Sequence, residues 1–240
     1  MWVYTYKFNP DGKFKKCKAR LVARGDQQKT TKQETYAATL AARSFRILMA
    51  IAARFGLELV QYDAVNAFVN ATLKDTIYMR MPTGHRIPGK ILRLNKALYG
   101  LRQSPLLWQK ELNTALQSLG FKAVPHEPCI LIRDGILVFF YVDDIVFAYR
   151  KEDTATAQAL ALQLQQRYEL TGGNELQWFL GIEVIRDRAR SLIWLSQTAY
   201  FDKIAALAGP QPSRKVKTPM ATIELLPYNG KADLHLITAY

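Results

Sequence analysis

The spacing of apolar positions changes repeatedly along the chain between period two and helical periods. Two extended runs flank residues 9–12, whose letters NPDG are typical of a turn, so residues 2–24 are predicted to form a β-hairpin. Alternation in the second run separates small apolar residues from basic ones. The apolar face, which we expect to pack, holds Cys17, Ala19, Leu21 and Ala23. The basic face, which is either a binding surface or a solvated one, holds Lys16, Lys18, Arg20 and Arg24.

Helical spacing of apolar residues predicts four helices. The first is expected to have Ser44 as its N-cap and Gly56 as its C-cap. The others are expected over residues 104–119, 153–170 and 198–209, the last one closed by Gly209.

Short extended runs occupy the segments between these helices. A buried strand is expected to end at Asp63, and hairpin turns are expected at residues 133–135 and 188–190. This mixture of hairpins and helices predicts an α+β fold with an antiparallel sheet and helices on one of its faces, rather than a doubly wound fold.

Composition indicates a folded protein with a polyanionic partner. The chain has 240 residues with 49% hydrophobic content, enough for a substantial core. Lys and Arg number 33 against 20 Asp and Glu, and the net charge of +13 favours nucleic acid over a membrane surface. Cys17 and Cys129 form no disulfide or zinc pattern, so free thiols are expected. No run approaches the about 18 apolar residues of a membrane span, so no membrane partner is expected.

Two adjacent acids, Asp143 and Asp144, stand inside the apolar and aromatic run FFYVDDIVFAY. Residues 136–142 and 145–148 are both predicted strands, so the acids would form the turn between them. Two carboxylates held close raise each other's pKa unless a cation neutralises them, and hard oxygen ligands suit Mg²⁺. The alternative is a solvated Asp-Asp turn. If the strand ending at Asp63 lies beside this hairpin, three carboxylates could hold two Mg²⁺ ions about 3.5–4 Å apart for phosphoryl transfer.

Six sequence blocks occur in the order and approximate spacing of a known family. They are KARLVARG, QYDAVNAFVN, ALYGLRQSP, YVDD, WFLGIEV and LSQTAYFDKI. The chain thereby resembles, over nearly its whole length, the reverse transcriptase of copia-type (Ty1/copia) long-terminal-repeat retrotransposons. The resemblance implies an α+β right-hand polymerase with fingers, a ferredoxin-like antiparallel palm and a partial thumb. The implied boundaries are 1–30 and 72–104 for the fingers, 31–71 and 105–185 for the palm, 186–222 for the partial thumb, and 223–240 for the start of a connection to an RNase H region.

The resemblance also implies roles for individual residues. The metal-binding catalytic carboxylates would be Asp63, Asp143 and Asp144, with Asp144 the more auxiliary. Lys18 and Arg20 match finger residues that grip the incoming triphosphate. Phe68 looks like the family's steric gate against a ribose 2′-hydroxyl, and its alternative is an ordinary core phenylalanine.

Two more blocks match binding segments of the family. The segment that lines the dNTP and template pocket would include Tyr99, Gly100, Arg102 and Gln103, although this loop must also start a helix. The primer grip would include Leu180, Gly181 and Ile182, and a plain hairpin would look the same without the family context.

The implied activity is RNA-directed DNA polymerisation, in which a primer 3′-hydroxyl attacks a dNTP on an RNA or DNA template with two Mg²⁺ ions, or Mn²⁺ in their place. Expected partners are the RNA template, the DNA primer, dNTPs, and protease, integrase and RNase H domains that have no sequence here. The family implies a cytoplasmic virus-like particle, with the nucleus as the alternative location.

The sequence also departs from the family pattern. ETYAATL replaces a more usual ETFAPV-like stretch, and FVNATL departs from FLNG. Two alternatives therefore stay open. One is a truncated, inactive nucleic-acid-binding remnant, and the other is a different palm-type nucleotidyl transferase or cyclase, which would not need the basic finger strand or the primer grip.

Overall fold

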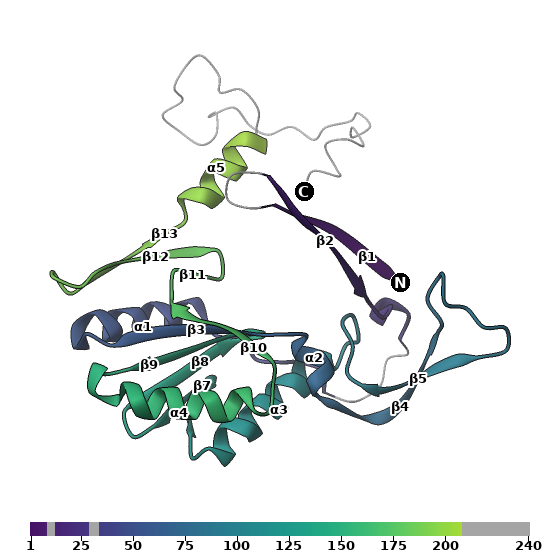
Figure 1. Ribbon diagram of the computed structural model, residues 1–240, viewed down its shortest axis with the longest axis horizontal. Helices are drawn as coiled ribbons and strands as arrows, with labels where there is room; N and C mark the ends of the chain where they lie inside the picture. The colour runs from purple at the N-terminus through teal and green to yellow at the C-terminus, as the bar shows by residue number, and fades with distance from the viewer. Residues whose placement is uncertain (9–12, 29–33, 208–240) are drawn as a thin grey trace, which may run out of the picture. The chain divides into compact units, whose positions relative to one another are not determined.

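The computed structural model describes residues 1–8, 13–28 and 34–207. The chain divides into two units, residues 1–197 and 198–240. The first unit is built on a six-stranded antiparallel sheet in the order β10-β3-β9-β8-β7-β6 (Figure 1). Its strands are β3 (Glu58–Ala64), β6 (Lys122–Val124), β7 (Glu127–Arg133), β8 (Ile136–Tyr141), β9 (Asp144–Tyr149) and β10 (Leu170–Glu175).

Four strands and two helices of this unit follow a split βαβ pattern. The chain order is β3, helix α3 (Ser104–Ser118), β8, β9, helix α4 (Thr154–Gln165) and β10. In space these strands lie in the order β10-β3-β9-β8, which is 4-1-3-2 when they are numbered along the chain. The antiparallel sheet and the mixed α+β content are therefore as predicted.

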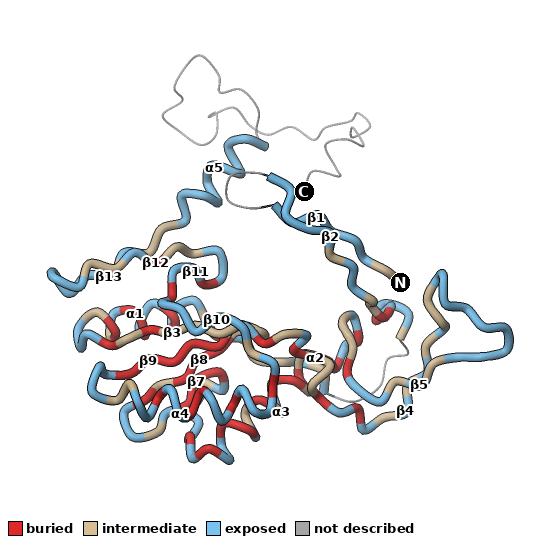
Figure 2. The backbone as a smooth tube through the Cα atoms, viewed as in Figure 1, coloured by how far each residue is buried: buried red, intermediate tan, exposed pale blue. Residues whose placement is uncertain are grey.

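Helices cover both faces of the sheet, so the prediction of helices on one face is wrong. Phe139 of β8 contacts Phe45 of helix α1 (Ala42–Phe55), with 6.4 Å between ring centroids. Its neighbour Val138 pairs with Phe147, which therefore points to the opposite face and contacts Phe121, just beyond α3. Figure 1 shows α1 on one side of the sheet and α3 and α4 on the other. The sequence signal for this double coverage was the unbroken apolar run of β9, because strands that are covered on both faces lose their alternation of apolar and polar residues. Figure 2 shows the buried backbone of β9 in red.

The ends of α1 agree with the sequence at one end only. Gly56 closes the helix with φ 63°, as predicted. The N-cap prediction of Ser44 is wrong, because the N-cap is Ala41 and Ser44 lies buried in the first turn. The Ser44 hydroxyl donates a hydrogen bond to Glu127 Oε1 at 2.6 Å instead.

Three smaller sheets and four helical segments complete the described chain. Both predicted hairpin turns, at 133–135 and 188–190, are present, whereas the turn at 9–12 and Gly209 lie outside the described residues. The hairpin of β4 and β5 was not among the predicted elements. The elements are β1 (Trp2–Phe8), β2 (Phe14–Leu21), η1 (Gly25–Gln27), α2 (Ala67–Asn70), β4 (Thr72–Arg80), β5 (Ile91–Lys96), η2 (Lys151–Asp153), β11 (Trp178–Phe179), β12 (Ile182–Asp187), β13 (Leu192–Ser196) and α5 (Thr198–Leu207).

The predicted packing of the small apolar residues is confirmed for Ala23, which is buried, and is wrong within strand β2, where even Leu21 is only half-buried. Cys17 and Ala19, expected to pack, are exposed, while Lys18 on the other face is half-buried. The reason is that β1 and β2 form a separate two-stranded ribbon. Tyr4 and Tyr6, which pair with Ala19 and Cys17 across the ribbon, are themselves exposed. None of the helices in the described part of the chain has the length and apolar character needed to cross a membrane.

Candidate active site

Three carboxylates lie at one end of the sheet. Strand β3 lies beside β9, and Asp63 is paired directly with Asp144 across the two strands. Asp143 occupies the adjoining turn, where its carbonyl oxygen accepts a hydrogen bond from Ala64 N at 2.8 Å. The turn is one residue earlier than predicted, because Val142 and Asp143 form it and Asp144 already belongs to β9. The acids therefore come from two strands that are held in register by backbone hydrogen bonds.

The turn before Asp143 is strained and braced. Val142 has φ 55°, a left-handed conformation that a β-branched residue adopts only at a cost of about 1–3 kcal/mol. The indole N–H of Trp108, a buried residue of α3, donates a hydrogen bond to the Val142 carbonyl at 2.6 Å. This hydrogen bond was not predicted from the sequence, although a buried tryptophan N–H generally needs an acceptor.

The local electrostatics disfavour ionised carboxylates. Burial and the charge of Asp143 raise the pKa of Asp63, while Lys18 and Arg20 oppose the shift. Burial also raises the pKa of Asp144, against the effect of a hydrogen bond that Gln61 Nε2 donates to Asp144 Oδ1 at 2.8 Å. Gln61 was another missed partner, and its position two residues before Asp63, on the same strand face, was the available signal.

The carboxylates suit a hard divalent ion in their chemistry, but they do not form a ready-made ligand set. Carboxylate oxygens are the donors that Mg²⁺ prefers, and burial is the main cause of the raised pKa values of Asp63 and Asp144, an effect that a bound cation would oppose. In residues 1–8, 13–28 and 34–207, no three Asp, Glu, His or Cys side chains are close enough together to hold a metal ion as they stand. The Asp144 carboxylate is turned to Gln61.

Basic and aromatic side chains lie next to the acids. The Arg20 guanidinium carbon is 5.2 Å from the centroid of the Tyr99 ring, and that ring is 4.6 Å from the ring of Phe68. Burial and the charge of Asp143 raise the pKa of Tyr99. Burial and the charge of Arg20 lower the pKa of Lys18. The structure thus brings four of the predicted binding residues to the carboxylates.

Gly100 belongs to a joint between two loops. The Tyr99 carbonyl accepts a hydrogen bond from Ala23 N at 2.7 Å. Gly100 has φ 88°, and a Cβ there would overlap the carbonyl oxygen of Ala23 and lie 2.6 Å from Val22 Cγ1. Gly25 contacts Gly100 in the same way, since a Cβ on Gly25 would overlap the Gly100 carbonyl oxygen. Two of the family-like blocks, KARLVARG and ALYGLRQSP, are therefore joined backbone to backbone.

Arg102 and Gln103 also support this joint and its surroundings. Arg102 Nε donates a hydrogen bond to the Gly25 carbonyl at 2.9 Å. Gln103 is buried, and its Nε2 donates to Asp75 Oδ2 at 3.2 Å. These bonds fix the loop that carries Tyr99.

The predicted primer-grip residues form the tight turn between β11 and β12. Leu180 and Gly181 have φ 54° and 73° and are exposed, and Ile182 begins β12. The residue before the turn, Phe179, is buried, with its ring centroid 4.9 Å from that of Phe45 and 5.6 Å from that of Phe139. The turn is therefore displayed on a strand that is anchored in the core.

Comparisons with known proteins agree on one family. Residues 1–222 match the family model described as Reverse transcriptase (RNA-dependent DNA polymerase). The chain is 34% identical to the Retrovirus-related Pol polyprotein from transposon RE2 of Arabidopsis thaliana, and the match covers 100% of this chain and 17% of the polyprotein. It is 29% identical to the corresponding polyprotein from transposon TNT 1-94 of Nicotiana tabacum, over 92% of this chain and 17% of that protein.

Two further similarities are more distant. The Transposon Ty1-DR1 Gag-Pol polyprotein of Saccharomyces cerevisiae is 24% identical, over 84% of this chain and 12% of its own length. A solved structure of the foamy viral protease-reverse transcriptase dRH in complex with ds DNA is 15% identical with a TM-score of 0.42, over 90% of this chain and 35% of that chain. The chain thus spans 17% or less of the length of these transposon polyproteins. As the sequence blocks predicted, this chain belongs to the reverse transcriptase (RNA-dependent DNA polymerase) family, and its relatives are copia- and Ty1-type transposon polyproteins.

Proposed function

We propose that this domain transfers deoxynucleotides from dNTPs to a primer 3′-hydroxyl under the direction of an RNA or DNA template. The observation that carries the proposal is the pairing of Asp63 with Asp144, with Asp143 in the adjoining turn and Lys18 and Arg20 close enough to shift the pKa of Asp63. Acids that can bind cations and bases that can bind phosphates therefore lie at one end of one sheet, as phosphoryl transfer requires.

The sheet with strand order 4-1-3-2 would be the palm, and the β1–β2 ribbon would belong to the fingers. Asp63 and Asp143 would hold the divalent ions, with Asp144, bonded to Gln61, in an auxiliary role. Bound Mg²⁺ or Mn²⁺ would supply positive charge that activates the attacking oxygen and stabilises the leaving one.

The groups around the acids would orient the nucleotide. Lys18 and Arg20 would bind the triphosphate and offset charge on the departing pyrophosphate. Arg20 is held against the Tyr99 ring, and Phe68 packs against the same ring. The ring of Phe68 would then limit the space at the ribose 2′ position. Because Phe68 is only half-buried, it is not confined to the core.

The template and primer would be bound mainly through charge. A net charge of +13 suits a duplex backbone that must be held without sequence preference, and such binding weakens steeply with salt. The exposed turn of Leu180 and Gly181 would contact the primer 3′ end. Further polyprotein domains, such as RNase H, integrase and protease, would be partners of the natural system.

The test is primer extension on an RNA template with Mg²⁺, comparing the wild-type chain with Asp143→Asn. Asp134→Asn is a matched control, because Asp134 occupies the turn at the opposite end of β8. We expect extension by the wild type and the control and loss of extension in Asp143→Asn. Template binding without extension by the wild type would favour the inactive remnant, and template-independent conversion of nucleoside triphosphates would favour a cyclase.

A further inference from the structure

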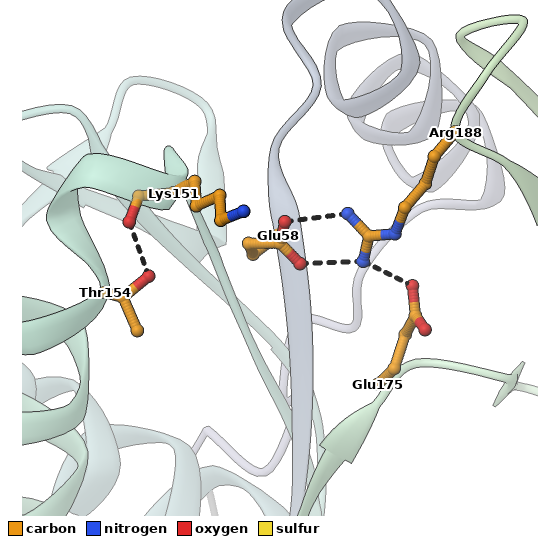
Figure 3. Close-up of polar contacts among 5 residues, drawn as sticks. All are labelled: Glu58, Lys151, Thr154, Glu175 and Arg188. Carbon is orange, nitrogen blue, oxygen red and sulfur yellow. Dashed lines mark hydrogen bonds and ion pairs between the residues drawn. The ribbon is translucent and has the colours of Figure 1, made fainter.

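An arginine fork fastens the β12–β13 hairpin to the sheet. Arg188, the first residue after β12, donates hydrogen bonds from Nη1 to Glu58 Oε1 and from Nη2 to Glu58 Oε2, both at 2.7 Å. Arg188 Nη2 also donates to Glu175 Oε1 at 2.7 Å. Figure 3 shows the guanidinium between the two carboxylates, which come from β3 and β10. One side chain therefore joins three strands.

The three strands place this fork at the far end of the elements that form the site. Glu58 is the first residue of β3, and Asp63 lies five residues further along the same strand. Arg188 follows the last residue of β12, whose first residue, Ile182, follows the Leu180–Gly181 turn. Six extended residues span about 17–20 Å in each strand. The fork thus fixes the end of β12 that is remote from the exposed turn.

The turn end of β12 has its own anchors. Phe179 is buried against Phe45 and Phe139, and the backbone N–H of Leu176 donates to the Leu59 carbonyl at 3.0 Å. The segment between β10 and β12 is therefore tied to the sheet near its start and near its turn. Val184, in the middle of β12, is also buried in the core, so the fork adds a polar anchor at the remote end of a strand that the core already holds nearer its turn.

Other cations also lie near Glu58. Arg186 and Lys151 also lie near Glu58, and the hydrogen bonds from Arg188 lower the pKa of Glu58. Among the described residues Arg186 Nη1 is buried without a hydrogen-bond partner, and burial and the charge of Arg188 lower the pKa of Arg186. Of the residues that the structure describes, only Arg188 bonds to both Glu58 and Glu175, with a fork that a lysine cannot reproduce.

We propose that Arg188 is a positioning residue for the primer 3′ end. By fixing the remote end of β12 to Glu58 and Glu175, it sets where the Leu180–Gly181 turn stands relative to Asp63. This inference rests on the proposed function, because it assumes that the turn contacts the primer strand.

The experiment compares Arg188→Ala with Arg190→Ala, an exposed neighbour in the same hairpin turn whose ion pair with Asp187 is 3.8 Å long. Because the fork is half exposed, we expect the KM for primer–template to rise about three- to tenfold in Arg188→Ala, with the KM for dNTP and the thermal midpoint close to wild type. Arg188→Lys should recover only part of the primer affinity, and Arg190→Ala should match the wild type.

A second readout does not require catalysis. A primer with 2-aminopurine at its 3′ terminus should show a changed fluorescence in complex with Arg188→Ala but not with Arg190→Ala. Absence of extension by the wild type would count against the proposed function, whereas unchanged primer KM and unchanged fluorescence in Arg188→Ala would overturn the inference. Equal losses in primer KM, dNTP KM and thermal midpoint would also overturn it, by showing a purely structural role. If Arg188→Ala does not fold, Glu175→Gln, which weakens only the third bond, must raise the primer KM without changing that for dNTP.

Discussion

The joint at Gly100 gives the sharpest test of how the segment with strands β1 and β2 is attached. Gly100 and Gly84 both have φ 88°, but their surroundings differ. A Cβ at Gly84 meets nothing within 4 Å, whereas a Cβ at Gly100 overlaps the Ala23 carbonyl oxygen and lies 2.6 Å from Val22 Cγ1. Alanine at the two positions therefore suffers the same backbone strain, and only at Gly100 does it also meet a clash. The difference between the two variants isolates the packing of the joint.

The expected magnitudes follow from these contacts. Left-handed backbone strain costs about 1–2 kcal/mol for alanine and applies to both variants. At Gly100 the two backbones must separate, which weakens the hydrogen bond from Ala23 N to Tyr99 O by about 1 kcal/mol and adds about 1–3 kcal/mol of overpacking. The free energy of unfolding should fall by about 3–6 kcal/mol for Gly100→Ala and by about 1–2 kcal/mol for Gly84→Ala.

Urea unfolding followed by tryptophan fluorescence measures both values, since the midpoint and slope give the free energy of unfolding. Single-nucleotide incorporation gives a second measure. Strand β2, which carries Lys18 and Arg20, leads directly to Ala23, so Gly100→Ala should also raise the KM for dNTP. Equal losses of stability in Gly100→Ala and Gly84→Ala would refute the reasoning, because the backbone contact would then contribute nothing.

Three further outcomes are expected. Burial raises the pKa of Asp144 above its value in the unfolded chain, so ionisation of Asp144 destabilises the folded state as the pH rises between the unfolded and the folded pKa. Asp144→Asn should therefore be as stable as the wild type, or more stable, at pH 7. The difference in thermal midpoint between the two proteins should vanish below pH 4, where Asp144 is protonated in both states. Trp108→Phe keeps the ring but leaves the Val142 carbonyl without its donor, and should lower the free energy of unfolding by about 1–3 kcal/mol and reduce primer extension. Burial raises the pKa of Cys129 to about 11 while Cys17 is exposed, so a thiol reagent at pH 8 should modify one cysteine in the native protein and two in urea.

Features fixed by neighbouring residues were predictable from the sequence. Asp134 and Gly135 have φ 47° and 81°, which is what an Asp-Gly pair between two apolar runs indicates. Gly56 ended its helix for the same local reason. Ser44 shows the limit of such signals, because its hydroxyl bonds to Glu127, 83 residues away, and a distant partner can override a local capping preference.

The residues of the site show the same difference between local signals and long-range partners. Acids at strand ends could be expected to meet, and Asp63 does pair with Asp144. The partners that hold them could not be predicted from spacing alone. Gln61 depends on strand register, and Trp108 depends on how α3 packs beneath the turn. The exposed face of β2 was misjudged because alternation separates two faces but does not show which one is covered.

The positions of Lys18 and Arg20 connect the charge of the site with its attachment to the sheet. These cations oppose the upward shift in the pKa of Asp63, so the basic strand and the acids attract one another. A divalent cation near Asp63 would weaken this attraction, and the phosphates of a nucleotide would replace the carboxylate as the partner of both bases. The Ala23–Gly100 joint does not depend on these charges, because it consists of backbone contacts. Under the proposed function, the strand would exchange one anionic partner for another while its base remains fixed, and a nucleotide would take the place between the bases and the acids without detaching that segment.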